Sequence, residues 1–137
     1  MADKKTLTFS IMDAPFENAR TVTALRMINV AANRGYNINV FAYEGAVGLS
    51  FTKQAGHPNA VHDHDLDEED HPLPNEWIAS ILRTAEANGG KVDWINCGLC
   101  VDERGVTESV EGTRRGTPGD LWKAAEASDG TLIIGAK

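Results

Sequence analysis

Strand-like and helix-like segments alternate along this chain, and that order limits its fold more than any other feature. Four short β-rich apolar segments, residues 6–12, 36–43, 92–96 and 131–134, are each bounded by turn residues. Apolar residues at helical spacing fill the intervals 16–34, 77–85 and 118–128. Such alternation predicts a mostly parallel sheet covered on both faces. We expect a single three-layer, flavodoxin-like α/β domain over residues 1–137.

Turn and capping residues indicate where the helices begin and end. Gly35 suits the left-handed position after the first helix, and Asn75 is a predicted N-cap of the second. Thr117, followed by a proline and by Asp120, is a predicted N-cap of the last helix. Residues 98–110 are expected to form a turn or a short helix. Residues 111–119, with two adjacent arginines, are expected to be an exposed loop, with anion binding as the alternative.

A long polar segment, residues 52–74, shows no periodicity and predicts a loop. It holds six acids between His62 and His71, and without them the rest of the chain is nearly neutral. His62, His64 and His71 are weak candidate metal ligands, because imidazole and carboxylate together bind transition metals. A solvated loop, or a docking surface for a basic partner protein, explains the same composition.

Composition and charge exclude several classes of function. The formal net charge of −7, from 13 basic and 20 acidic residues, argues against a nucleic-acid partner. No apolar run is long enough to span a membrane, and no secretory signal is visible, so a cytoplasmic location is the expectation. No glycine-rich phosphate loop follows the first strand, so nucleotide or flavin binding is disfavoured.

Chemistry is concentrated in the two cysteines, Cys97 and Cys100, at the predicted carboxyl end of the third strand. Open α/β sheets place their sites at that edge. A helix beginning near Gly98 would favour a thiolate there, and Arg104 would add a positive charge. Two buried structural cysteines, a redox pair, a sulfur-carrying or acyl-attacking nucleophile and half of a zinc site all fit this spacing.

These residues are arranged as in a known family. The first strand and its turn, the segments 17–35 and 37–48, and above all residues 95–106 (INCGLCVDERGV) resemble the DsrE/DsrF-like family, which includes TusD-type sulfur-relay subunits. The resemblance spans nearly the whole chain. Cys97 matches the family's strand-end cysteine through its seven-residue distance to Arg104, Gly105 and Val106. The second cysteine and the acidic loop depart from the sulfur-relay subunits.

The resemblance implies a sulfur carrier or sulfurtransferase that passes sulfur as a cysteine persulfide between donor and acceptor proteins. Cys97 would carry the sulfur, and Cys100 would resolve the persulfide as a disulfide or act as a second carrier. Arg104 is the third candidate site residue, through its positive charge. The resemblance also implies a homo-oligomer, trimer or hexamer, or a hetero-oligomer with related subunits, and no cofactor. Two alternatives stay open: an oligomeric protein that binds a metal or small ligand through the histidine loop, and a dithiol redox protein.

Overall fold

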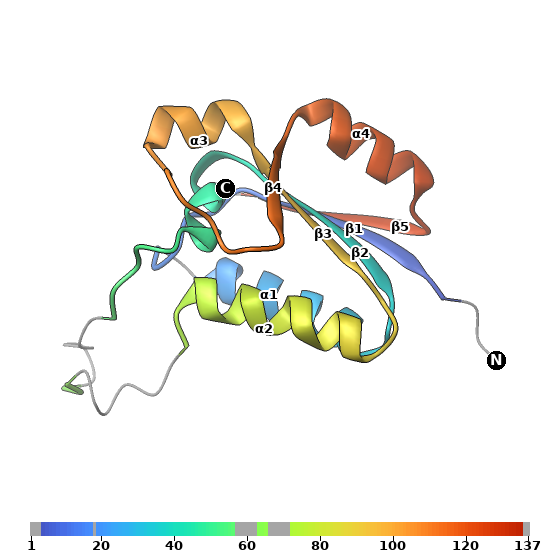
Figure 1. The fold of residues 1–137 in the computed structure, drawn as a ribbon, viewed down its shortest axis with the longest axis horizontal. Coiled ribbons are helices and arrows are strands. Elements are labelled where there is room, and N and C mark those ends of the chain that lie inside the picture. Colours follow the sequence, from blue (N-terminus) through green and yellow to red (C-terminus); the bar gives the residue numbers. More distant parts are fainter. Residues whose placement is uncertain (1–3, 18, 57–62, 66–71, 136–137) are drawn as a thin grey trace.

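The computed structural model describes residues 4–17, 19–56, 63–65 and 72–135, and its centre is a five-stranded parallel sheet (Figure 1). The strands lie in the order β4-β3-β2-β1-β5, so β4 and β5 form the edges. Their bounds are β1 Thr6–Ile11, β2 Asn37–Ala42, β3 Val92–Cys97, β4 Thr113–Gly116 and β5 Gly130–Ile134. The four strands expected from the sequence are confirmed, each within two residues at either end.

Helices cover both faces of the sheet and complete the three layers (Figure 1). Helices α1 (Ala19–Asn33) and α2 (Pro74–Ala87) lie together on one face, and α3 (Gly98–Arg104) and α4 (Pro118–Ala127) lie on the other. A 3-10 helix, η1 (Glu44–Ser50), follows β2 and contacts α2 and α3. The three-layer α/β architecture expected from the sequence is therefore confirmed. Among the described residues, none of these helices is both long and apolar enough to cross a membrane.

The two faces of the sheet are packed very differently. Under α1 and α2 lies a large apolar core that includes Phe9, Trp94 and Ile81, all at most 2% exposed. On β1 the neighbours of Phe9, Thr8 and Ser10, are polar and also buried, because alternate side chains of a strand point to opposite faces. A smaller apolar cluster on this second side contains both cysteines. The larger core therefore supports the fold, and the smaller cluster surrounds the candidate chemistry.

Capping residues were predicted with mixed success. Gly35 adopts a φ of 72° after α1, and the Asp120 carboxylate accepts the Thr117 backbone N–H at 2.8 Å, as expected. The prediction for Asn75 is wrong, since α2 begins at Pro74 with Leu73 as its N-cap. Asn75 instead donates its side-chain Nδ2–H to Phe51 O at 2.9 Å.

Asn75 takes part in a polar clamp between the two ends of the long loop. Its backbone N–H donates to Gln54 Oε1 at 3.1 Å. The Gln54 amide nitrogen in turn donates to the carbonyls of Gly48 and Leu49, at 2.8 and 2.9 Å. Both ends of the loop are therefore tied to η1 by the same pair of side chains.

The expected exposed loop at residues 111–119 contains a strand that the sequence did not predict. β4 pairs in parallel with β3, and Arg115 lies in register with Asn96. Its four residues, TRRG, show no alternation of apolar and polar side chains. It is an edge strand, and edge strands often carry exposed charged residues such as these two arginines. Before it a turn or a short helix was expected, and the structure has the helix, α3.

We expect Gly116→Ala to destabilise the protein by about 1 to 3 kcal/mol, because a Cβ at this end of β4 meets the buried Ile95 Cγ2 and lies 2.7 Å from Asp120 Oδ2. Gly130→Ala in the opposite edge strand is the matched control. A Cβ there lies 3.5 Å from Leu7 Cδ2, so unfolding should change by less than about 1 kcal/mol. Urea unfolding of both variants measures the difference; equal losses would contradict the packing of β4.

Candidate functional site

Strand β3 passes directly into helix α3, and both cysteines lie at this junction. Cys97 is the last strand residue and the N-cap of the helix, which begins at Gly98. Cys100 follows one helical turn later on the same side, since positions three apart in a helix are neighbours. The two cysteines are free and buried, with exposed fractions of 7% and 6%.

The thiols contact each other within the smaller apolar cluster. The side chains of Cys97 and Cys100 lie in the same buried cluster as Val47, Ile95 and Val101. Burial raises the pKa of the Cys100 thiol, and its contact with Cys97 raises it further. The Glu44 backbone N–H, which donates to Cys100 Sγ at 3.1 Å, opposes this shift. Cys100 is therefore held as a protonated thiol at neutral pH.

Arg104 is linked to Cys100 through Glu44, which contacts both residues. Its guanidinium donates to Glu44 Oε2 at 2.9 Å, in the last turn of α3. Glu44 has a left-handed backbone with φ 49°, an uncommon conformation for a residue other than glycine. A second arginine, Arg115, lies within electrostatic reach of Cys97.

Arg115, on β4, lies across the start of α3. Its Nη1 and Nη2 donate to the two carboxylate oxygens of Asp102, at 2.9 and 3.1 Å. Nη2 lies 2.9 Å from where a Cβ on Gly98 would be, so only glycine leaves room for this approach. The Asp102 carboxylate raises the pKa of Arg115, and negative charge on Cys97 adds to that effect. Arg115 is therefore the guanidinium within electrostatic reach of the strand-end cysteine.

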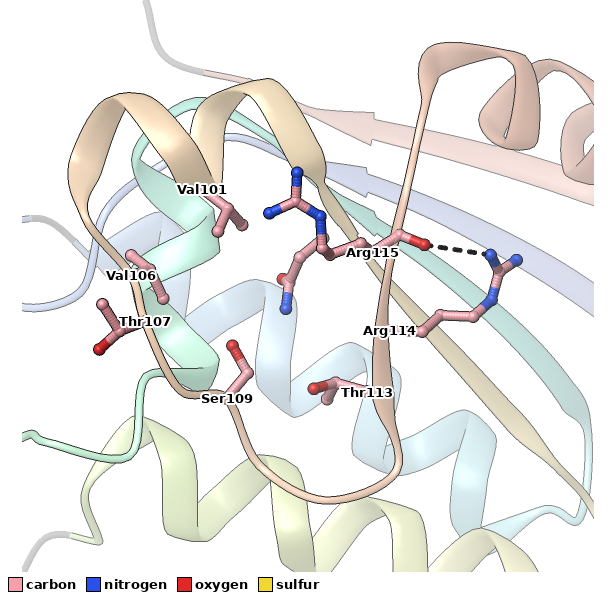
Figure 2. Close-up of a pocket in the computed structure, with 8 residues that line it drawn as sticks. Val101, Val106, Thr107, Ser109, Thr113, Arg114 and Arg115 are labelled. Atoms are coloured by element: carbon pink, nitrogen blue, oxygen red, sulfur yellow. Dashed lines mark hydrogen bonds between the residues drawn. The ribbon is translucent and has the colours of Figure 1, made fainter.

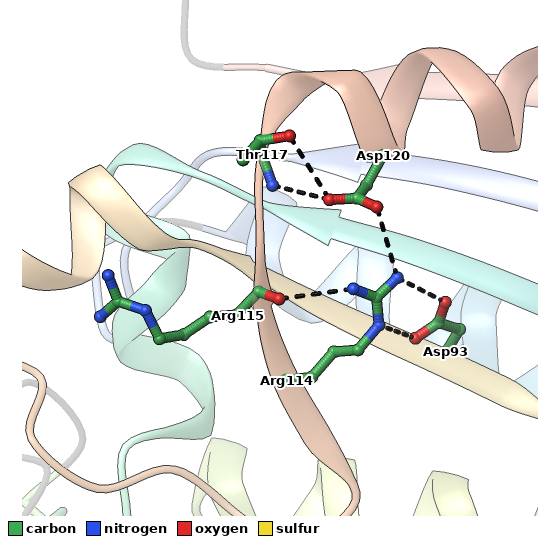
Figure 3. Close-up of polar contacts among 5 residues, drawn as sticks. All are labelled: Asp93, Arg114, Arg115, Thr117 and Asp120. Carbon is green, nitrogen blue, oxygen red and sulfur yellow. Dashed lines mark hydrogen bonds and ion pairs between the residues drawn. The ribbon is translucent and has the colours of Figure 1, made fainter.

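The neighbouring Arg114 points the other way (Figure 3). It forms a two-pronged ion pair with Asp93, at 2.8 and 3.0 Å, and lies 3.7 Å from an oxygen of Asp120. These contacts tie β4 to β3 and to the start of α4. The two adjacent arginines therefore bind different partners, Arg114 on β3 and α4 and Arg115 on α3, because successive strand residues face opposite sides of the sheet.

A shallow pocket of about 250 Å³ lies between α3, the segment after it and β4 (Figure 2). Polar side chains of Asn96, Ser109, Thr113 and Arg115 line it, and Val101 and Val106 supply its apolar wall. Asn96 is 2% exposed; its Nδ2 donates to Ser50 Oγ at 2.9 Å, and its Oδ1 has no hydrogen-bond partner. The pocket therefore combines a guanidinium with an unpartnered buried acceptor.

The histidine candidates are only partly described. His62 and His71 lie outside the described residues, and His64 is exposed. In the described part of the chain, no group of three or more histidine, cysteine, aspartate or glutamate side chains is arranged to hold a metal ion.

Sequence reasoning located the two cysteines but missed Asn96 and Arg115. Asn96 directly precedes Cys97, and a polar residue inside an otherwise apolar strand was the available signal. Arg115 was noted only as one of two adjacent arginines in an expected loop, with anion binding as the alternative, because its position depends on a strand that the local sequence does not predict.

Comparison with known proteins gives a consistent result for the whole chain. The sequence model of the DsrE/DsrF-like family matches residues 5–133. The crystal structure of the ychN protein from E. coli has a TM-score of 0.73 and 18% identity, covering 94% of this chain and 98% of that one. At this identity the likeness shows the shared three-layer fold. None of the curated proteins matches.

In Cys97→Ser, where Cys100 is the only thiol, we expect alkylation by iodoacetamide to rise with pH through a midpoint above about 8.5, the pKa of a free thiol. Burial, the largest cause of the raised pKa, remains in this variant. The same variant in urea is the control and should show the ordinary midpoint. A folded-state midpoint at or below the control would contradict the environment described for Cys100.

Proposed function

The chain belongs to the DsrE/DsrF-like family, and we propose that within sulfur metabolism it carries sulfane sulfur as a persulfide on Cys97. One arrangement carries the proposal: a cysteine at the carboxyl end of β3 that contacts a second thiol and lies within electrostatic reach of Arg115. A guanidinium attracts the thiolate that such chemistry needs.

The transfer step follows the chemistry of thiol–disulfide exchange. The Cys97 thiolate attacks the outer sulfur of a donor persulfide, the donor's S–S bond breaks, and the donor leaves as a thiolate with the electron pair. The outer sulfur stays on Cys97 and keeps its proton or negative charge. The reverse reaction with an acceptor thiolate unloads it, so neither direction needs an external oxidant or reductant.

Cys100 is proposed to support Cys97 rather than to carry the sulfur first. Its raised pKa keeps the thiol protonated, which makes it a poor nucleophile and a hydrogen-bond donor to a persulfide. Arg104 is proposed as a positioning residue, because its ion pair with Glu44 steadies the backbone N–H that contacts Cys100.

A dithiol redox protein is the second candidate function, and the contact between the two thiols favours it. A disulfide between Cys97 and Cys100 would form with two electrons passing to an oxidised partner. The two candidates differ in what the protein holds afterwards: added sulfur in the first, and only a disulfide in the second.

The proposed setting is the cytoplasm, with donor and acceptor proteins as partners and a second copy of this chain as a subunit. Edge strand β5 and helix α4 supply the surface proposed for self-association. Trp122 and Ile133 are exposed there by 71% and 72%. An unpaired edge strand with apolar side chains is a natural site for contact with another chain.

We expect wild-type protein incubated with inorganic polysulfide to gain the mass of added sulfur by intact-mass spectrometry. Cys97→Ser should lose this gain, because the attacking thiolate is removed. Cys100→Ser should retain it, since the second thiol is not the first acceptor.

The other outcomes separate the alternatives. A gain lost only in Cys100→Ser would move the carrier to Cys100. A mass decrease corresponding to a disulfide, with no sulfur added, would favour the redox candidate. No change, together with slow alkylation of both thiols, would mean that the cysteines are structural.

Light scattering should show an oligomer for wild type, and Ile133→Asp should reduce its mass, because a buried carboxylate without a partner is unfavourable in an apolar contact. Val30→Asp is the matched control, since Val30 is 50% exposed on α1, the opposite side of the sheet. A monomeric wild type, or the same effect from both variants, would count against this interface.

A further inference from the structure

The pocket between α3 and β4 contains a buried acceptor that the fold leaves unused. Asn96 Oδ1 has no hydrogen-bond partner, although the residue is 2% exposed and lines the pocket. Buried polar atoms are nearly always satisfied, and exceptions call for a water, an ion or a ligand. This atom points to a ligand that brings an N–H or O–H donor.

The Asn96 side chain is held firmly where it is. Its Nδ2 donates to the hydroxyl of Ser50, which is 0% exposed at the end of η1. The carbonyl of the same Ser50 accepts the Val110 backbone N–H at 2.9 Å, which fixes the segment between α3 and β4. The acceptor is therefore preorganised, and binding a ligand there would not require the amide to be ordered first.

Arg115 supplies the complementary charge. Asp102 takes two of its five N–H donors, which leaves three for another acceptor. Arg115 and Asn96 lie in register on neighbouring parallel strands, so both side chains belong to the same side of the sheet. A guanidinium fork matches a carboxylate, which accepts two parallel hydrogen bonds. The pocket therefore offers a cation for an anionic group and, beside it, an acceptor for a donor group.

We propose that this pocket binds a small α-amino acid bearing a persulfide, with its carboxylate on Arg115 and its ammonium group donating to Asn96 Oδ1. A volume of about 250 Å³ lies below the range for drug-sized ligands, about 300 Å³ and above, and suits a molecule of this size. The inference rests on the proposed function, for which it names the class of sulfur donor.

The bound donor would pass its outer sulfur to Cys97, which does not line the pocket but directly follows Asn96 in β3 and lies within electrostatic reach of Arg115. The Cys97 thiolate attacks the outer sulfur, the bond between the two donor sulfurs breaks, and the amino acid leaves as its thiolate with the electron pair. The outer sulfur remains on Cys97 as a persulfide, so atoms and electrons balance without a further reactant. The departing amino acid thiolate keeps both contacts in the pocket until it is exchanged.

Binding of S-methyl-L-cysteine, which cannot transfer sulfur, tests the site by titration calorimetry. Arg115→Gln should weaken its binding at least about tenfold, because a charge-assisted hydrogen-bond pair is lost. The affinity of Arg115→Lys should lie between those of wild type and Arg115→Gln, since lysine keeps the charge but lacks the guanidinium fork. Arg83→Gln, at an exposed position of α2 that does not line the pocket, should bind as wild type does. Equal binding by wild type and Arg115→Gln, or no binding by wild type, would overturn the proposal.

The ammonium contact has its own readout. Wild type should bind S-methyl-L-cysteine more tightly than 3-(methylthio)propanoate, which lacks the amine, and Asn96→Leu should remove that preference. If Asn96→Leu does not fold, the preference of wild type alone decides, and its absence would overturn the assignment of Asn96.

Labelling by inorganic polysulfide separates this proposal from the function on which it rests. Sulfur added to Cys97 by polysulfide, without any binding of S-methyl-L-cysteine, would overturn the amino-acid site and leave the carrier role intact. Binding that follows the expected pattern, without sulfur added by polysulfide or by cysteine persulfide, would leave the ligand site and overturn the carrier role.

Discussion

The direct passage of β3 into α3, with no connecting residue, is the constraint on which the candidate site depends. A strand buried on both faces fixes the position of its last residue, so Cys97 cannot move independently of the sheet. The helix that begins at the next residue then places Cys100 beside it. Because Gly98 has no side chain, Arg115 can lie against the junction. A single connecting residue inserted here would separate all three groups.

The two faces of the sheet differ in what they contribute: one holds the main apolar core and the other holds the two cysteines. The α1 and α2 side buries Trp94, Leu25, Ile28, Ile78 and Ile81 almost completely, and such close-packed apolar contact dominates the stability of small domains. The other side has polar residues on β1, and no residue of α4 is fully buried. Because the larger core supplies the stability, the smaller side can hold two free thiols and exposed apolar residues such as Trp122.

The fold could be predicted from the sequence where hydrophobic periodicity was strong. The apolar residues of β1, β2 and β3 indicated buried strands, and the structure buries most of them. The apolar run of β5 indicated a strand too, although its middle residues are exposed. β4 could not be predicted, because its two arginines respond to partners on β3, α3 and α4 that are distant in the sequence. The failed N-cap at Asn75 has the same origin: a side chain that suits a local cap instead bonds to Phe51.

The candidate site was predicted in the same uneven way. Cys97 and Cys100 were found because both lie in one local segment, where spacing alone brings them together. Arg104 was chosen for its nearness in sequence, and at the end of the seven-residue α3 it pairs with Glu44. The guanidinium near Cys97 comes from β4 instead, and only the pairing of β4 with β3 brings it there.

The clamp between Gln54 and Asn75 has a consequence for engineering. Gln54 and Asn75 are both tied to η1. A change in the chain between these two residues should therefore not alter the sheet or the positions of the cysteines. The entropy of closing a chain segment grows slowly with its length, by about 0.6 kcal/mol for each doubling. A reporter peptide or an affinity tag inserted between Gln54 and Asn75 would therefore leave the junction of β3 and α3 undisturbed.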